Sequence, residues 1–266
     1  MKRRLAIFAL FAALLAAGAE KLHVADATGS DGDAITGILL SLAAERPQLE
    51  LSVRKLDAES AFEKLDAGDF DVVLVNGDDL PQKYRAAALR YSTAAFVAAV
   101  NIKNPLRNIR GKDLRLLLDT PRPRWELVGG SAAEIHRFAV ITRKGGIAGA
   151  KLLNLAIGGE GMMTFPTVGE AVILAESDPS ALVWGPFAST LPLSVVALRI
   201  DGVAPTRAEI RSGNYPLSVG RFAVCAERPN EAARKFLELL RSGEAAQLLE
   251  ADGEVPELPE VRRSGK

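Results

Sequence analysis

The sequence predicts an α/β protein built as two lobes. Two rounds of strand, helix and strand occupy residues 22–75, an order that is typical of parallel strands in an α/β sheet. Strands and helices then continue to alternate to about residue 250. The chain has 266 residues, which is long for a single α/β core and favours two lobes over one.

Each expected element follows a local pattern. An apolar run at residues 22–25 ends in a turn cluster, residues 34–45 carry apolar side chains at helical spacing, and residues 49–53 alternate like a strand. A short helix at 58–65 and a buried strand at 71–75 follow. The later strands are expected at 94–100, 138–142, 181–184, 195–200 and 222–226. The later helices are expected at 111–118, 147–157, 168–176, 231–240 and 244–250, before a charged, proline-containing tail.

The amino terminus has the pattern of a secretory signal peptide. Basic residues at positions 2–4 precede an uncharged stretch from Leu5 to Ala19, which is shorter than the roughly 20 apolar residues that span a bilayer. The stretch ends in Ala17-Gly18-Ala19, small residues with the spacing that signal peptidase cleaves. We expect residues 1–19 to be a cleaved signal peptide, with an uncleaved membrane anchor as the alternative.

Charge and composition exclude several classes of protein. The 33 basic residues balance 33 acidic ones, whereas nucleic-acid-binding proteins concentrate Lys and Arg. One cysteine, Cys225, excludes a disulfide framework, and His23 and His136 leave little for a histidine-based metal site. The chain contains no serine-hydrolase elbow, zinc-protease helix or complete phosphate loop. We therefore expect no metal, no cofactor, no nucleic-acid partner and no enzymatic activity.

Several short motifs occur in an order that one family shares. They are Val100-Asn101-Ile102-Lys103-Asn104-Pro105, Trp125 followed by Val128-Gly129-Gly130, Asp201-Gly202-Val203-Ala204-Pro205-Thr206 and Ser212-Gly213-Asn214-Tyr215-Pro216-Leu217. In this order, and behind a signal peptide, they resemble the phosphate-type substrate-binding proteins of bacterial ABC transporters. The resemblance runs from about Ala94 to Leu249 and fits more loosely from Leu22 to Leu80.

The resemblance implies a two-lobed periplasmic binding protein-like fold of type II, with the ligand in a cleft between the lobes. Lobe 1 would comprise residues 20–98 and 195–266, and lobe 2 would comprise residues 99–194. The implied function is that of a periplasmic, monomeric solute-binding protein. It would bind phosphate or another small oxyanion and deliver it to an ABC-transporter permease. Lobe closure around the ligand would need no bond chemistry and no cofactor.

The resemblance also implies three anion-binding loops at helix N-termini, where free N–H groups and the helix dipole favour negative charge. The implied ligand residues are Ser30 and Asp31 in the first loop, Asn76 and Asp78 in the second, and Arg143, Gly145 and Gly146 in the third. Arg143 would add charge-assisted hydrogen bonds, and a solvated surface arginine is the alternative. Ser30 has the alternative role of a simple helix cap.

Three positions depart from the loops of the family. Ile147 stands where the third loop carries a serine, Gly149 stands near its threonine, and Asp31 replaces a hydroxyl in the first loop. Each lost charge-assisted hydrogen bond costs about 1.5–3 kcal/mol. The alternative function is therefore a divergent non-transport scaffold or interaction protein that keeps the fold and has a degraded cleft. An exported hydrolase would need a nucleophile and a base that the sequence does not offer.

Overall fold

The computed structural model describes residues 20–29, 34–142, 146–155 and 161–257. The signal peptide expected at residues 1–19 lies outside these ranges. None of the helices in the described ranges is long and apolar enough to cross a membrane.

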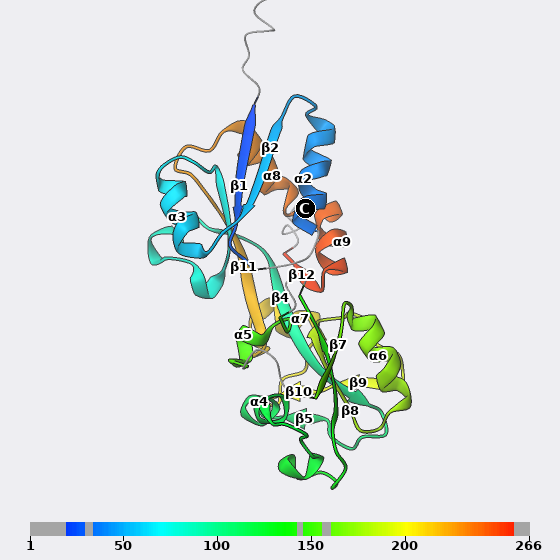
Figure 1. The fold of residues 1–266 in the computed structure, drawn as a ribbon. Helices are drawn as coiled ribbons and strands as arrows, with labels where there is room; N and C mark the ends of the chain where they lie inside the picture. Colours follow the sequence, from blue (N-terminus) through cyan, green and yellow to red (C-terminus); the bar gives the residue numbers. More distant parts are fainter. Residues whose placement is uncertain (1–19, 30–33, 143–145, 156–160, 258–266) are drawn as a thin grey trace, which may run out of the picture.

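In the described residues, ten strands form one sheet that extends through both parts of the molecule (Figure 1). The strands are β1 (Lys21–Asp26), β2 (Glu50–Lys55), β3 (Val72–Asn76), β4 (Leu89–Asn101), β6 (His136–Val140), β7 (Met162–Phe165), β8 (Ala181–Pro186), β9 (Val195–Ala197), β11 (Ser218–Cys225) and β12 (Glu254–Pro256). Their order is β2-β1-β3-β11-β4-β8-β6-β7, and β9 and β12 also pair with β4. A separate pair joins β5 (Asn108–Ile109) to β10 (Arg199–Ile200).

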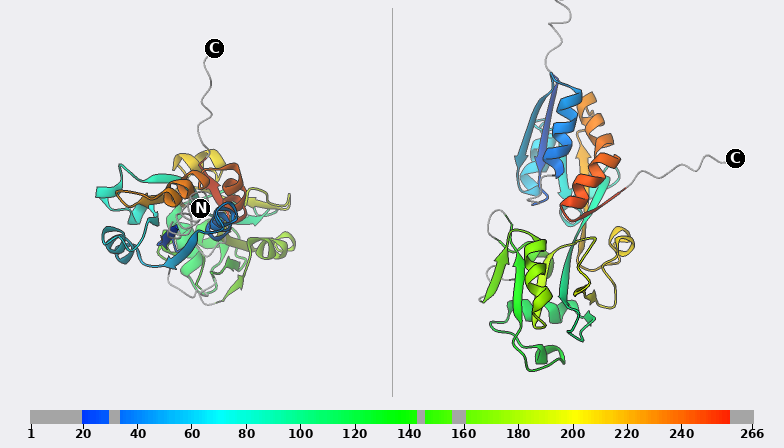
Figure 2. Two further views of the ribbon diagram at one scale, coloured as in Figure 1. Left: turned by 90° about the horizontal axis from the view of Figure 1, so that it is seen from above. Right: turned by 90° about the vertical axis from the view of Figure 1, so that its right-hand side faces the viewer.

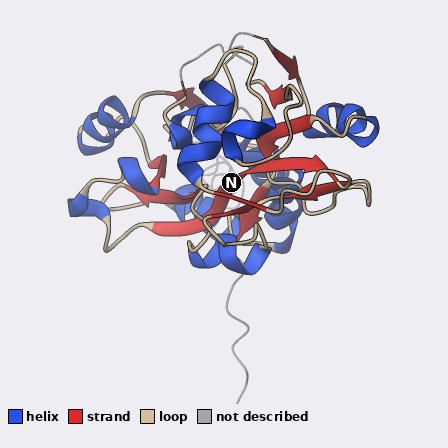
Figure 3. Ribbon diagram, turned by 90° about the horizontal axis from the view of Figure 1, so that it is seen from below, coloured by secondary structure: helices blue, strands red, loops and turns tan. Residues whose placement is uncertain are grey.

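Helices cover the sheet, as the view in Figure 3 shows. The helices are α2 (Ala34–Glu45), α3 (Ala58–Asp66), α4 (Gly111–Asp119), α5 (Ala150–Leu153), α6 (Val168–Ser177), α7 (Arg207–Ser212), α8 (Glu231–Leu239) and α9 (Gly243–Ala251), with single turns η1 (Gly77–Asp79), η2 (Gln82–Tyr84) and η3 (Trp125–Val128). Side chains cap several of them: Asp57 accepts the N–H of Ser60 in α3, and Ser242 accepts that of Ala245 in α9.

The strand-helix-strand rounds predicted from the sequence are present. β1 pairs in parallel with β2 and with β3, and α2 and α3 make the crossovers between these strands. The α/β class is therefore confirmed.

β4 connects the two lobes. Its residues 89–95 pair with β11 and β12, and its residues 96–101 pair with β8 and β9. The right-hand view of Figure 2 shows lobe 1, with β1, β2 and β3, above lobe 2, with β6, β7 and β8. Lobe 1 has a core around Leu42 and Phe236, and lobe 2 has a core around Leu114 and Trp184. The two-lobed fold predicted from the sequence is thus the observed one.

The exact lobe boundaries expected at residues 98 and 195 remain a prediction. Ile210 and Tyr215 belong to the same apolar cluster as Leu114, in lobe 2. The Tyr215 hydroxyl donates to the carbonyl of Phe96 at 3.0 Å. These contacts favour moving the second crossing to about residue 217.

Three strands were missing from the sequence prediction: β7, β12 and β5, the last of which pairs with β10. β7 pairs in parallel with β6 at the edge of lobe 2. β12 lies where the sequence suggested a charged tail, yet Val255 is 1% exposed and pairs with Thr93 of β4. The helix expected at 147–157 is present only as the short α5 within the described residues.

Candidate functional site

A cavity of about 640 Å³ lies where the two lobes meet. Its lining comes from both lobes and comprises residues 29, 94–96, 140–142, 148–149, 166–169, 186–190, 221 and 250–254. Phe96, Val140 and Phe187 provide apolar surface, while Thr142 and Thr167 provide hydroxyl groups. A lining that combines apolar surface with polar groups is typical of small-molecule sites. We call this cavity the cleft.

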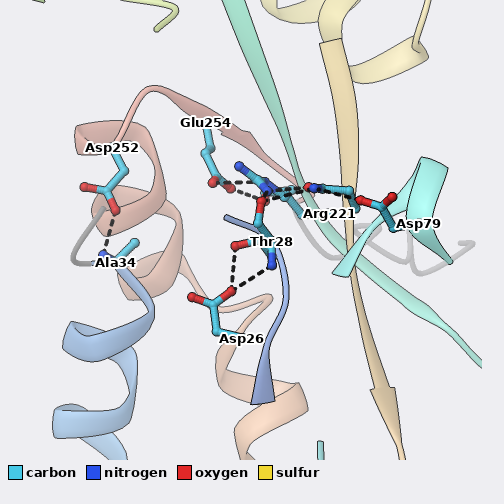
Figure 4. A network of polar contacts seen from close by, with 9 residues as sticks. Asp26, Thr28, Ala34, Asp79, Arg221, Asp252 and Glu254 are labelled. Atoms are coloured by element: carbon cyan, nitrogen blue, oxygen red, sulfur yellow. Dashed lines mark hydrogen bonds and ion pairs between the residues drawn. The ribbon is translucent and has the colours of Figure 1, made fainter. Parts of the chain in front are cut away.

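Arg221 lines the cleft and lies at the centre of a network of polar contacts (Figure 4). Its Nη1 donates to the carbonyl of Thr28 at 2.7 Å and to Oδ1 of Asn76. Its Nε lies 3.4 Å from Oε1 of Glu254, in an ion pair whose two side chains are at most 8% exposed. Arg221 therefore joins the ends of β1 and β3 to β12. We call Arg221, Thr28, Asn76 and Glu254 the floor network.

The loop after β1 is held in place by a short-range turn. The N–H and the hydroxyl of Thr28 both donate to Oδ1 of Asp26, at 3.0 and 2.6 Å. Nδ2 of Asn76 donates to the carbonyl of Thr28 at 3.1 Å. These bonds bring the first and second predicted loops together at the carboxyl ends of β1 and β3, the sheet edge where α/β proteins bind ligands.

Glu254 is buried among groups of both charges. Its Oε2 accepts a hydrogen bond from the hydroxyl of Ser92. Burial raises the pKa of Glu254 above its usual value, and the attraction of Arg221 and the bond from Ser92 act in the opposite direction. The charges of Asp252 and Asp26 add to the upward shift.

Two further carboxylates line the cleft, and each already has a partner. Oδ2 of Asp252 accepts the N–H of Ala34 at 2.7 Å, at the first described turn of α2 (Figure 4). Glu250 forms an ion pair with Arg207 of α7. The described lining of the cleft therefore carries more acidic than basic groups.

An ion pair bridges the two lobes beside the cleft. Nζ of Lys151, on α5, lies 3.1 Å from Oδ2 of Asp79, on η1. Asp79 in turn lies 3.5 Å from Nδ2 of Asn76. The bridge thus connects lobe 2 to the floor network.

We predict that Lys151→Glu opens the cleft without destabilising either lobe. The side chain of Lys151 is 81% exposed, so the pair contributes at most about 1 kcal/mol, but the substitution places two carboxylates against each other across the lobes. Small-angle X-ray scattering should show a larger radius of gyration. Lys21→Glu is the matched control, because it breaks an exposed pair with Glu50 inside lobe 1. Equal radii for both variants and the wild type would contradict the prediction.

Several of the predicted ligand residues cannot be placed. Ser30, Asp31, Arg143 and Gly145 lie outside the described residues.

The structure does place Asn76, Asp78 and Gly146. Asn76 lies in the floor network, next to the first loop. Asp78 is exposed on η1, and its neighbour Asp79 is the residue that reaches Lys151. The N–H of Gly146 donates to Oγ1 of Thr142 at 3.2 Å, so this donor is already engaged.

Arg221 and Glu254 were missed by sequence reasoning. The strand was predicted to begin at residue 222, which left Arg221 in a loop, and Glu254 was assigned to the charged tail. One sequence signal could have pointed to Arg221: a basic residue that follows Gly220 and directly precedes the apolar run of a strand.

The titratable residues that the sequence singled out show no catalytic arrangement. Nδ1 of His136 lies 2.6 Å from Oδ2 of Asp178 on the surface of lobe 2, and Nδ1 of His23 lies 3.3 Å from the carbonyl of Asp69. Burial raises the pKa of Cys225 to about 11, which keeps its thiol protonated at neutral pH. Within the part of the chain that the structure describes, no three His, Cys, Asp or Glu side chains are grouped so as to hold a metal ion.

The fold and the cleft together define the class: a two-lobed α/β architecture of the kind found in periplasmic binding proteins. No family model matches the sequence, and no curated protein matches it significantly. Solved structures do match the fold.

An ABC-type phosphate transport receptor from Vibrio cholerae superposes with a TM-score of 0.71 at 15% identity, over 89% of this chain and 99% of that one. A possible phosphate binding protein from Planctomyces limnophilus gives 0.73 at 17%, over 91% and 94%. PstS from Borrelia burgdorferi gives 0.66 at 13%, over 89% and 98%. The chain therefore has the fold of the phosphate-type substrate-binding proteins that its motifs resemble.

Proposed function

We propose that this chain is an exported solute-binding protein that binds phosphate or a related small oxyanion and delivers it to an ABC-transporter permease. The observation that carries the proposal is the floor network. It places the guanidinium of Arg221 between the loops that follow β1 and β3, inside a cleft between two lobes. Arginine is well suited to oxyanions because it donates charge-assisted hydrogen bonds in a planar fork. The solved structures named for phosphate support the same ligand class.

The remaining parts of the proposal come from the sequence. Residues 1–19 would direct export to the periplasm, and the mature chain would act as a monomer without bond chemistry. Ser30, Asp31, Arg143 and Gly145 would complete the site together with Asn76, Asp78 and Gly146. Gly146 would have to release Thr142 to donate to a ligand.

One observation favours the second candidate, a scaffold or interaction protein with a degraded cleft. Arg221 is already paired with Glu254, and Glu250 and Asp252 also line the cleft. A dianion would meet these carboxylates, which opposes binding unless residues such as Arg143 outweigh them.

Thermal unfolding of the mature chain with millimolar phosphate, sulfate or chloride tests the proposal. A ligand at about 100 times its dissociation constant stabilises the folded state by about 2.7 kcal/mol. For a protein of this size, the melting temperature should rise by about 5–10 °C with phosphate and not with chloride. Arg143→Ala should reduce the rise. The same melting temperature in all three salts would contradict oxyanion binding and favour the scaffold.

A further inference from the structure

The ion pair between Arg221 and Glu254 is the part of the cleft whose role the proposed function leaves open. We propose that this pair sets the affinity of the cleft for anions: Arg221 presents the positive charge to the ligand, and Glu254 opposes it. The inference rests on the proposed function, because it concerns the same cleft. It assigns Arg221 as a ligand-contacting residue and Glu254 as the residue that limits affinity and makes it depend on pH.

The position of Arg221 suits a ligand contact. The pairing of β11 with β4 shifts register between Arg221 and Phe222, and such a bulge redirects the side chains beside it. The Arg221 side chain lines the cleft although it is only 7% exposed. A guanidinium has five N–H donors. Nη1 of Arg221 donates to Thr28 and Asn76, while Nε has no hydrogen-bond partner among the residues that the structure describes.

The surroundings of Glu254 explain why it would oppose an anion. It reaches the cleft from β12, and four elements bring charged or titratable groups against it. These groups are Tyr91 from β4, Arg221 from β11, Asp26 from β1 and Asp252 from the end of α9. Ser92 of β4 adds a hydrogen bond from its hydroxyl. Arg221 is the one cation in this set, so an ionised Glu254 leaves the set with more negative than positive charge. Charges interact strongly in such a buried site because solvent screens them little.

The same arrangement predicts a dependence on pH. Burial raises the pKa of Glu254, so its carboxylate takes up a proton at a higher pH than an exposed glutamate does. Protonation removes the charge that competes with the ligand for Arg221. The affinity for sulfate, which stays a dianion over this range, should therefore increase as the pH falls.

Isothermal titration of the mature chain with sulfate and with inorganic phosphate tests the inference through two opposite substitutions. Arg221→Gln should weaken binding by at least about tenfold, the loss of one charge-assisted hydrogen bond. Glu254→Gln keeps the shape of the side chain and its contact with Ser92, and should strengthen binding by about tenfold. It should also abolish the increase in sulfate affinity at low pH.

The pair Lys21–Glu50 provides the matched control, because it is an exposed ion pair of lobe 1, with both side chains 58% exposed, and Glu50 is not among the residues that line the cleft. Glu50→Gln should change the affinity by less than about twofold. Arg221→Lys is the second variant if Arg221→Gln does not fold, and melting temperatures without anion report folding for each variant.

The outcomes separate the inference from the proposed function. If the wild type binds anions and Glu254→Gln binds them with the same or a lower affinity, the inference alone is overturned. The pair would then have a structural role. Absence of anion binding by the wild type and by every folded variant would overturn the proposed function and the inference together. The inference would be supported if Glu254→Gln binds anions more tightly than the wild type and its sulfate affinity does not change with pH.

Discussion

Gly149→Ala is expected to lower the melting temperature by roughly 5–15 °C. Gly149 has a φ of 71°, a left-handed conformation that costs an L-residue about 1–2 kcal/mol. A Cβ at this position would also overlap Cγ and Cδ1 of Phe96, well inside van der Waals contact. Overpacking of this kind costs about 1–3 kcal/mol more, and the sum gives the expected shift for a chain of this size.

The effect should extend to the cleft. Gly149 and Phe96 both line it, and Phe96 stacks on Trp184 with ring centroids 5.9 Å apart. Moving Phe96 to make room for a methyl group would therefore displace one wall, and any stabilisation by phosphate should decrease.

Gly68→Ala is the matched control for Gly149→Ala. Gly68 has a φ of 80°, but a Cβ there would meet no atom within 4 Å. The free energy of unfolding of this variant should fall only by the cost of the left-handed backbone conformation, about 1–2 kcal/mol. Differential scanning calorimetry of both variants separates the two effects. Equal losses would contradict the role of the contact with Phe96.

Trp184→Ala is expected to cost about 3–5 kcal/mol, because it removes a large, fully buried side chain from the core of lobe 2. Trp184→Phe isolates one part of this loss. Nε1 of Trp184 donates to the carbonyl of Ala148 at 2.8 Å, and Ala148 is buried and lines the cleft. Without that donor the carbonyl is left unsatisfied, at a cost of about 1–3 kcal/mol.

Trp125→Phe is the control for Trp184→Phe. Trp125 is also buried, at 3% exposed, but its Nε1 makes no hydrogen bond within the described structure. Unfolding in guanidinium chloride should therefore show a larger decrease in midpoint for Trp184→Phe than for Trp125→Phe, with similar slopes. The reverse order would contradict the importance of the bond to Ala148.

Local patterns predicted most of the secondary structure. The helix expected at residues 34–45 is α2, and the strand expected at 71–75 is β3, shifted by one residue. Apolar spacing and turn residues act over a few positions, so a sequence alone contains them. β12 could not be predicted in this way, because three residues with a glutamate and a proline form a strand only when β4 offers an edge to pair with.

The turns that follow β1 and β3 could be recognised from the sequence, because turn residues are local. Their role as ligand loops is what the resemblance to phosphate-type binding proteins implies, and it stays a prediction. Arg221 could not be recognised from the sequence, because its partners Thr28 and Asn76 are 193 and 145 residues away along the chain. Its charge also matters only because it is buried, which is a property of the packed molecule.

The sequence by itself determined the α/β class, the order of the elements and the loops after β1 and β3, since periodicity and turn chemistry are local. Only the tertiary structure decided which charged residues line the cleft. The pairing of β11 and β12 with β4 brings Arg221 against Glu254 and excludes water from both. In that buried setting the charges of Arg221 and Glu254 act strongly on each other, because solvent screens them little.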